Sequence, residues 1–197
     1  PPGGEVRGFD TGPGNVLLDL WCARHQGTPF DADGAWAATG TPDATVLQAL
    51  SDEPFFALLP PKSTGRDLFN AAWLDEHLAA LQWRGRAEDM QATLTALTAL
   101  AVAAAIAAHA PDATTMLVAG GGARNGTLLR MLQTARPAMR VVTTDAMGVA
   151  SDHVIESFRN DLYPGYKTGE GMDPVLLRQI PVMEEALTAC GFTTWDM

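Results

Sequence analysis

The sequence is poor in cysteine and in basic residues, and each shortage argues against a class of function. Its 197 residues include two cysteines, Cys22 and Cys190, which lie far apart and match no metal-ligand spacing. Thirteen basic residues (Lys+Arg 13) face 23 acids, and the net charge of −10 argues against nucleic acid or an anionic membrane as a partner. Cys22 falls in an apolar helical pattern, which predicts a buried thiol in a reducing compartment.

A targeting signal and a long apolar run are also missing. Residues 1–5 carry neither a basic nor an apolar stretch. The most apolar stretch, residues 94–108, is interrupted by Thr95 and Thr98, and we expect it to be too short to span a bilayer. We therefore expect a cytoplasmic protein without a membrane partner. Because the sequence opens abruptly and without Met, we also expect it to be a piece of a longer chain.

Residue patterns for nucleophilic or metal catalysis are absent. Ser63, Ser151 and Ser157 lie in no nucleophile elbow, and the four histidines are scattered along predicted helices. No cluster of His, Cys and Asp has metal-site spacing. Phosphoryl transfer stays compatible with the sequence, because it depends on positioning and charge neutralisation. It also needs a base, and no residue stands out for that role.

What the chain does contain is a stretch that predicts a strand, a glycine turn and a helix. The strand is expected over Val6–Asp10 and the helix over Pro13–Gln26, with Gly27 beyond its end. This arrangement directs backbone N–H groups and the positive end of a helix toward one point, which suits a phosphate. Asp10, at the end of the strand, is placed to hold Mg²⁺ directly or through water.

A second glycine turn, Gly120–Asn125, follows a strand predicted over residues 114–119. A helix over 125–135 and a strand over 139–143 come next, so this half is α/β. The turn is neither the dinucleotide fingerprint nor a P-loop. Its adjacent glycines let a flat ring or a ribose lie against bare backbone, while a tight turn without a ligand stays equally open. Asn125 is expected to cap the helix or to bond the ligand, and our hypothesis is that both turns face one nucleotide.

Other segments predict mainly helices and connecting loops. Helices are expected over residues 42–50 (capped by Thr39 or Thr41), 69–81 and 87–109, the last of them buried. Two acids, Asp31 and Asp33, precede a glycine and favour a solvated turn over a calcium loop. Residues 60–67 carry two cations and two hydroxyls, which is usual for a surface connection. Residues 158–173 are expected to be irregular and 174–189 to form a helix.

Several motifs together resemble one known family. They are Gly8–Asn15, Asp31–Ala38, Pro61–Arg66, Gly120–Asn125 and Thr144-Asp145, in this order. The chain resembles the later half of anhydro-N-acetylmuramic acid kinase, a member of the actin, hexokinase and heat-shock ATPase superfamily. The resemblance implies an α/β fold: a ribonuclease-H-like, ATP-facing lobe with a large helical content over residues 1–156, followed by an atypical, partly helical tail over 157–197.

The resemblance also implies a function. The family uses ATP and water to open the 1,6-anhydro ring of anhydro-N-acetylmuramic acid and to phosphorylate the sugar, which gives N-acetylmuramic acid 6-phosphate in cell-wall recycling. ATP and Mg²⁺ are the implied cofactors, with Asp10 at the metal. The implied cofactor-binding residues form two groups, one for the phosphates and one for the adenosine: Asp10, Gly12, Gly14 and Asn15, and Gly120, Gly121, Gly122 and Asn125.

Two departures from the family pattern limit what this chain is expected to do. The family's first phosphate loop and its catalytic aspartate, in an Asp-Phe-Arg motif, are not in this sequence. We therefore assign no catalytic residue here and expect the isolated chain to be inactive. Residues 152–160 also replace the family's Glu-Ala-x-Ala-Phe-Ala-x-Leu-Ala helix. The alternatives are a degenerate nucleotide-binding or interaction module without catalysis, or another sugar kinase of the superfamily. A homodimer stays open.

Overall fold

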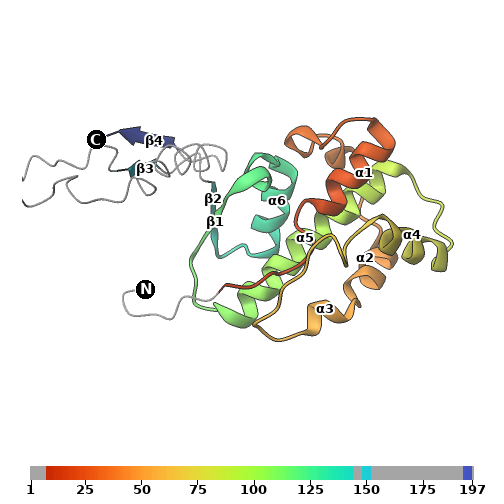
Figure 1. Cartoon of the computed structure of the whole chain (residues 1–197), viewed down its shortest axis with the longest axis horizontal. Helices are drawn as coiled ribbons and strands as arrows, with labels where there is room; N and C mark the ends of the chain where they lie inside the picture. The colour runs from red at the N-terminus through yellow and green to blue at the C-terminus, as the bar shows by residue number, and fades with distance from the viewer. Residues whose placement is uncertain (1–7, 144–147, 152–192, 197) are drawn as a thin grey trace, which may run out of the picture. The chain divides into compact units, whose positions relative to one another are not determined.

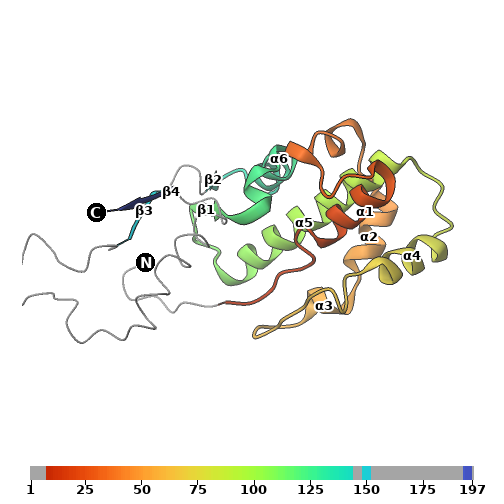
Figure 2. The same cartoon turned by 45° about the horizontal axis from the view of Figure 1, so that its top comes forward.

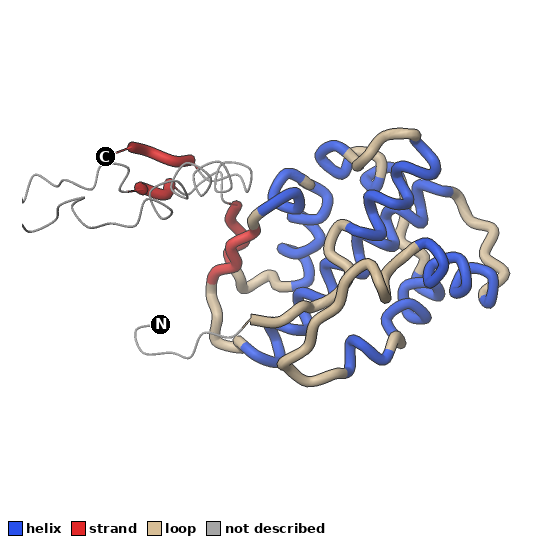
Figure 3. Tube along the Cα trace, viewed as in Figure 1, coloured by secondary structure: helices blue, strands red, loops and turns tan. Residues whose placement is uncertain are grey.

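The computed structural model describes residues 8–143, 148–151 and 193–196 of the chain (Figure 1). They fall into two compact units, which are described separately. The first comprises residues 1–116 and 124–141, and the second comprises 117–123 and 142–197. Helices dominate the first unit (Figure 3). They are α1 (Val16–Gln26), η1 (Ala32–Gly34), η2 (Ala37–Thr39), α2 (Ala44–Ser51), α3 (Pro54–Ala57), α4 (Ala71–Ala80), α5 (Ala87–His109) and α6 (Gly126–Ala135).

Helix α5 is the centre of the first unit. It contacts α1, α2, α6 and η2, and Figure 2 shows α1, α2 and α6 arranged along it. Every residue from Met90 to Ala99 is buried, and the many alanines let neighbouring helices approach closely. The bounds predicted for this helix, residues 87–109, are confirmed, and so is its burial over the first half of its length.

Polar side chains in the buried part of α5 are mostly satisfied within the protein. The hydroxyl of Thr95 donates to the carbonyl of Gln91, one turn earlier, and Thr98 donates to Leu94 in the same way. Thr93 donates to the carbonyl of Asp89 and accepts from the amide of Asp43. The Gln91 amide is the exception, because neither of its polar atoms has a partner among the described residues.

Some helices of the first unit, α2 and α4 among them, begin at side-chain caps. The Asp43 carboxylate accepts from the amides of Thr45 and Val46, so α2 starts directly after Asp43. The predicted cap, Thr39 or Thr41, is wrong: the Thr41 amide instead donates to Asp89, on α5. Helix α4 starts at an Asn70 cap, inside the range predicted for it.

Four short strands complete the described structure. β1 (Thr115–Val118) pairs with β2 (Arg140–Thr143), and in the second unit β3 (Gly148–Ser151) pairs in parallel with β4 (Thr193–Asp196). The predicted α/β class and the strands on either side of α6 are confirmed. Residues 144–147 and 152–192 lie outside the described residues, and with them lie the Thr144-Asp145 motif, the irregular segment expected over 158–173 and the helix expected over 174–189.

Helix α5 is the element that bears on the question of a membrane. By length and composition alone, its 23 residues are sufficient to cross a bilayer, and the stretch that we expected to be too short, residues 94–108, is only part of this helix. The same test is passed by core helices of soluble proteins, and half of the apolar window is buried in this fold. The test is therefore weak evidence for a membrane span.

Candidate functional site

The segment that leads into α1 is extended but is not a strand in its described part. Residues 8–10 have no strand pairing, so the predicted strand is wrong there, and residues 6 and 7 lie outside the described residues. The Asp10 amide instead donates to the carbonyl of Lys62, with an N···O distance of 3.1 Å. The neighbour that bonds the Asp10 backbone is therefore the loop at Lys62 and not a strand.

Glycines bring the turn after Asp10 close to α5. A side chain at Gly12 would place its Cβ 2.9 Å from a ring carbon of Phe56 and 3.3 Å from the Cβ of Ala101. Gly14 has a φ of +55°, which favours glycine, and no atom lies within 4 Å of the place of its missing Cβ. The Gly14 carbonyl accepts from the Thr98 hydroxyl at 2.9 Å. The turn is thus fixed on α5 while its outer side stays open.

Helix α1 begins directly after this turn with its N-terminus uncapped. Asn15 occupies the cap position, but its side chain makes no capping hydrogen bond. The first N–H groups of a helix lack acceptors within the helix and carry a partial positive charge, so this end suits an anion. Burial raises the pKa of Asp19 in the first turn, and the nearby Arg66 guanidinium partly opposes this rise. A cation thus lies near the start of α1.

The carboxylate of Asp10 is held by two neutral donors. Its Oδ2 accepts from the Thr64 amide and from the Ser63 hydroxyl, each at 2.8 Å. These bonds hold the pKa of Asp10 below its usual value, the Thr64 amide contributing more than Ser63, and partial desolvation opposes them weakly. Among the described residues, Oδ1 accepts no hydrogen bond. Asp10 therefore presents an ionised oxygen near neutral pH.

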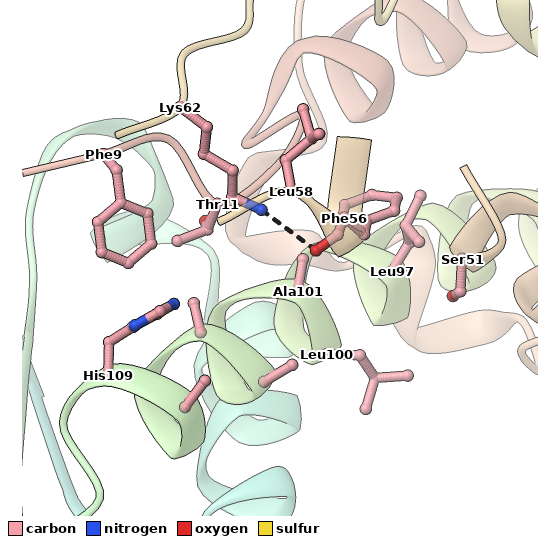
Figure 4. A pocket seen from close by; sticks show the side chains of 13 residues that line it. Phe9, Thr11, Ser51, Phe56, Leu58, Lys62, Leu97, Leu100, Ala101 and His109 are labelled. Atoms are coloured by element: carbon pink, nitrogen blue, oxygen red, sulfur yellow. Dashed lines mark hydrogen bonds between the residues drawn. The ribbon is translucent and has the colours of Figure 1, made fainter. Parts of the chain in front are cut away.

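Residues 62–66 are the part of the site that sequence reasoning left without a role. Lys62 donates from Nζ to the carbonyls of Phe55 and Phe56, at 3.1 and 3.2 Å, and lies 4.6 Å from the centre of the Phe55 ring. Figure 4 shows the bond to Phe56. The residues that hold Asp10 are 53 and 54 positions away in sequence. The hydroxyls in the Pro61–Arg66 motif were the feature of the sequence that could have indicated this contact with Asp10.

The second glycine turn forms a short 3₁₀ helix, η3 (Gly120–Arg124), that follows β1. Gly120 has a φ of +70°, so glycine is favoured there, and Gly121 and Gly122 continue the turn. Gly120–Gly122 belong to the second unit, whereas the turn after Asp10 belongs to the first. The assignment of these glycines to an adenosine site therefore stays a prediction.

Asn125 and Asp33 complete the N-terminus of α6, in the first unit. The Asn125 side chain accepts from the Leu128 amide at 2.9 Å, so the predicted cap is confirmed. Asp33 Oδ1 accepts from the Gly126 amide at 3.0 Å, and the Thr127 hydroxyl donates to the Gly34 carbonyl. A carboxylate thus already covers the start of α6, which disfavours a phosphate there.

The turn that contains Asp33 is more than the solvated connection that we predicted. The Asp31 carboxylate accepts from the amides of Trp36 and Ala37, both at 2.9 Å, while Asp33 reaches α6. Both acids thus bond backbone amides rather than water alone. In the described part of the chain, no group of three or more His, Cys, Asp or Glu residues is arranged to hold a metal.

A pocket of about 340 Å³ lies along α5 but does not contain the predicted phosphate residues. Figure 4 shows Phe9, Thr11, Lys62 and His109 around it, and most of the remaining lining is apolar. Lys62 is already bonded to two carbonyls. A nucleotide phosphate needs free donors, so we place no phosphate in this pocket.

A single half-buried carboxylate, that of Asp10, fits Mg²⁺ better than a transition metal. Mg²⁺ usually takes one or two carboxylates and completes its coordination with water and substrate phosphates. Asp10 offers one ionised oxygen beside an uncapped helix N-terminus, which is the type of donor set that this ion prefers when a nucleotide is bound. The residues present therefore fit the implied metal.

Comparison with known proteins identifies the family. The family described as anhydro-N-acetylmuramic acid kinase matches residues 1–158. The chain belongs to the anhydro-N-acetylmuramic acid kinase family. The resemblance that the motifs predicted is thus confirmed.

Curated members of the anhydro-N-acetylmuramic acid kinase family show how much of a relative this chain covers. One from Burkholderia cenocepacia is 54% identical over 156 residues, which are 77% of this chain and 41% of that protein. One from Ralstonia nicotianae is 50% identical over 150 residues, 76% of this chain and 39% of that protein. One from Pseudomonas putida is 52% identical over 149 residues, 76% and 41%. The chain spans about two fifths of the length of these relatives.

Proposed function

We propose that this chain is the ATP-facing lobe of a kinase that opens the 1,6-anhydro ring of anhydro-N-acetylmuramic acid and phosphorylates the sugar to N-acetylmuramic acid 6-phosphate. The observation that carries the proposal is the Asp10 carboxylate, held by Ser63 and Thr64 beside the uncapped start of α1. The family match supports the choice of substrate. The proposal includes a ribonuclease-H-like lobe, a cytoplasmic location and a role in cell-wall recycling.

Each group of residues has a separate task in this proposal. Asp10 holds Mg²⁺ directly or through water, and the ion when bound neutralises phosphate charge. Gly12, Gly14 and Asn15 present backbone N–H groups and an open surface to the phosphates. The turn at Gly120–Gly122 lies against the adenosine, where bare backbone lets a flat ring approach. Asn125 caps α6, which follows that turn in the chain.

The proposal also includes the absence of turnover by the chain alone. A kinase needs a base that accepts the proton of the attacking hydroxyl or water. The sequence has no Asp-Phe-Arg motif, and no described residue near Asp10 takes its place. The chain is therefore expected to bind Mg-ATP weakly and to leave the anhydro-sugar unchanged.

Calorimetry with Mg-ATP tests this proposal. The wild-type chain is expected to bind the nucleotide, and Asp10→Asn is expected to bind Mg-ATP more weakly while keeping its affinity for adenosine, because the amide cannot supply a charged ligand to Mg²⁺. Absence of binding by a chain that is folded by circular dichroism would overturn the proposal and favour the degenerate module. Equal loss of both affinities would make Asp10 a structural residue.

A further inference from the structure

Residues 62–64 contact Asp10 at both its backbone and its side chain. The Lys62 carbonyl accepts from the Asp10 amide at 3.1 Å, and Ser63 and Thr64 donate to the same carboxylate oxygen, Oδ2. Two donors on one oxygen fix the rotation of the carboxylate about its Cβ–Cγ bond. They also make the two oxygens different: Oδ2 is bonded within the protein, whereas Oδ1 accepts no hydrogen bond among the described residues.

The donors that hold Asp10 are neutral, so the carboxylate keeps its whole negative charge. In the described residues no lysine or arginine forms an ion pair with Asp10, and the cations of this segment face elsewhere. The Lys62 ammonium donates to two carbonyls of α3. The Arg66 guanidinium interacts with the Asp19 carboxylate. A carboxylate that is oriented but not neutralised attracts a cation, whereas a carboxylate paired with lysine or arginine does not.

Lys62 gives the segment a firm attachment. Its ammonium donates to the carbonyls of Phe55 and Phe56 and lies over the Phe55 ring, which belongs to the core. Figure 4 shows the Lys62 side chain extending toward the Phe56 carbonyl. Ser63 follows directly and is exposed, so its hydroxyl is held in place by the backbone rather than by packing.

We propose that Ser63 is a positioning residue for the bound Mg-nucleotide: with the Thr64 amide it fixes Asp10 so that Oδ1 faces the metal. The inference rests on the proposed function, and it gives the Pro61–Arg66 motif a task in it. A competing explanation is that the bond between Ser63 and Asp10 only fastens one loop to another. The two explanations differ in whether loss of the hydroxyl acts through the metal.

Nucleotide titrations with and without metal distinguish these explanations. We would titrate the full 197-residue chain with ATP in Mg²⁺ and with ATP in EDTA, using Ser63→Ala, Ser63→Thr and Ser51→Ala. Ser51→Ala is the matched control, because among the described residues the Ser51 hydroxyl bonds only the Leu47 carbonyl of its own helix. Thermal unfolding of each variant reports whether it is folded.

Ser63→Ala is expected to weaken binding of Mg-ATP by on the order of tenfold, the usual effect of one hydrogen bond to a charged group. Binding in EDTA is expected to stay within about twofold, since a free nucleotide does not use Asp10. Ser63→Thr keeps a hydroxyl and is expected to restore most of the Mg²⁺-dependent affinity, and Ser51→Ala is expected to match the wild type.

Any other result of these titrations would contradict either the positioning role of Ser63 or the proposed function. Unchanged Mg-ATP binding by a folded Ser63→Ala chain, or equal losses with and without Mg²⁺, would overturn the positioning role and leave the proposed function intact. Failure of Ser63→Thr to recover affinity would also overturn it. Absence of nucleotide binding by the wild-type chain would overturn the proposed function, and the positioning role would fall with it.

Discussion

Gly14 and Gln91 show how single residues of this chain depart from what their surroundings usually favour. Gly14 adopts a φ of +55° at the turn before α1, and its carbonyl is bonded by Thr98. Gln91 is fully buried on α5, and its amide lacks a partner among the described residues. The first departure serves the proposed phosphate turn, and the second lowers stability without serving the proposed site.

Replacing Gly14 with alanine is expected to lower the free energy of unfolding by about 1 kcal/mol, because a Cβ disfavours positive φ. Gly8→Ala is the matched control: Gly8 does not have a positive φ, and its added Cβ would meet nothing within 4 Å. Chemical denaturation of both variants measures the difference. Equal losses would contradict a conformational role for Gly14.

Replacing Gln91 with methionine is expected to raise the free energy of unfolding by about 1 kcal/mol, because the burial of an unpaired amide is costly and methionine has a similar volume. Gln48→Met is the control, since the Gln48 side chain is exposed and donates to Asp52. Thermal unfolding checks the prediction. A lower midpoint for Gln91→Met than for the wild type would show that the amide is satisfied in solution.

At the scale of elements, the start of α6 depends on a segment far away in sequence. Asp33 and Gly34, in η1, bond Gly126 and Thr127 across 93 residues. The added Cβ of an alanine at Gly34 would lie 2.1 Å from Asn125 Oδ1, so η1 and the cap of α6 are tightly packed.

Loss of the Asp33 carboxylate is expected to loosen this clamp. Asp33→Ala should lower the free energy of unfolding by about 1–2 kcal/mol, because the Gly126 amide loses a charged acceptor at the positive end of α6. Asp112→Ala, at an exposed acid with no hydrogen bond among the described residues, is the control. Hydrogen exchange of the Gly126 amide is expected to quicken only in Asp33→Ala. Unchanged exchange in that variant would contradict the clamp.

Local patterns were sufficient for some elements and insufficient for contacts between distant segments. The apolar run and the flanking charges predict α5, and the asparagine before α6 predicts its cap. The cap of α2 was missed because Thr41 is bonded by Asp89, which lies 48 residues away. The pairing of Asp10 with Ser63 was missed for the same reason, since periodicity contains no information about which loop meets which.

At the scale of the whole molecule, the strong negative charge determines what the proposed site must supply. A chain with a net charge of −10 repels a nucleotide at long range, so binding depends on local features. The uncapped start of α1, the open turn at Gly14 and a metal at Asp10 are such features in the first unit. The glycine turn of the second unit offers bare backbone. We propose that nucleotide binding depends on such local features of each unit.

Amide chemical shifts in an NMR titration test this central claim most directly. Mg-ATP is expected to shift the amides of residues 11–15 and of residues 120–125, whereas adenosine alone is expected to shift only the second group. The difference arises because adenosine has no phosphates for Asp10 and the start of α1. Shifts confined to residues that line the pocket along α5, or a Mg-ATP titration that leaves residues 11–15 unmoved, would contradict the account.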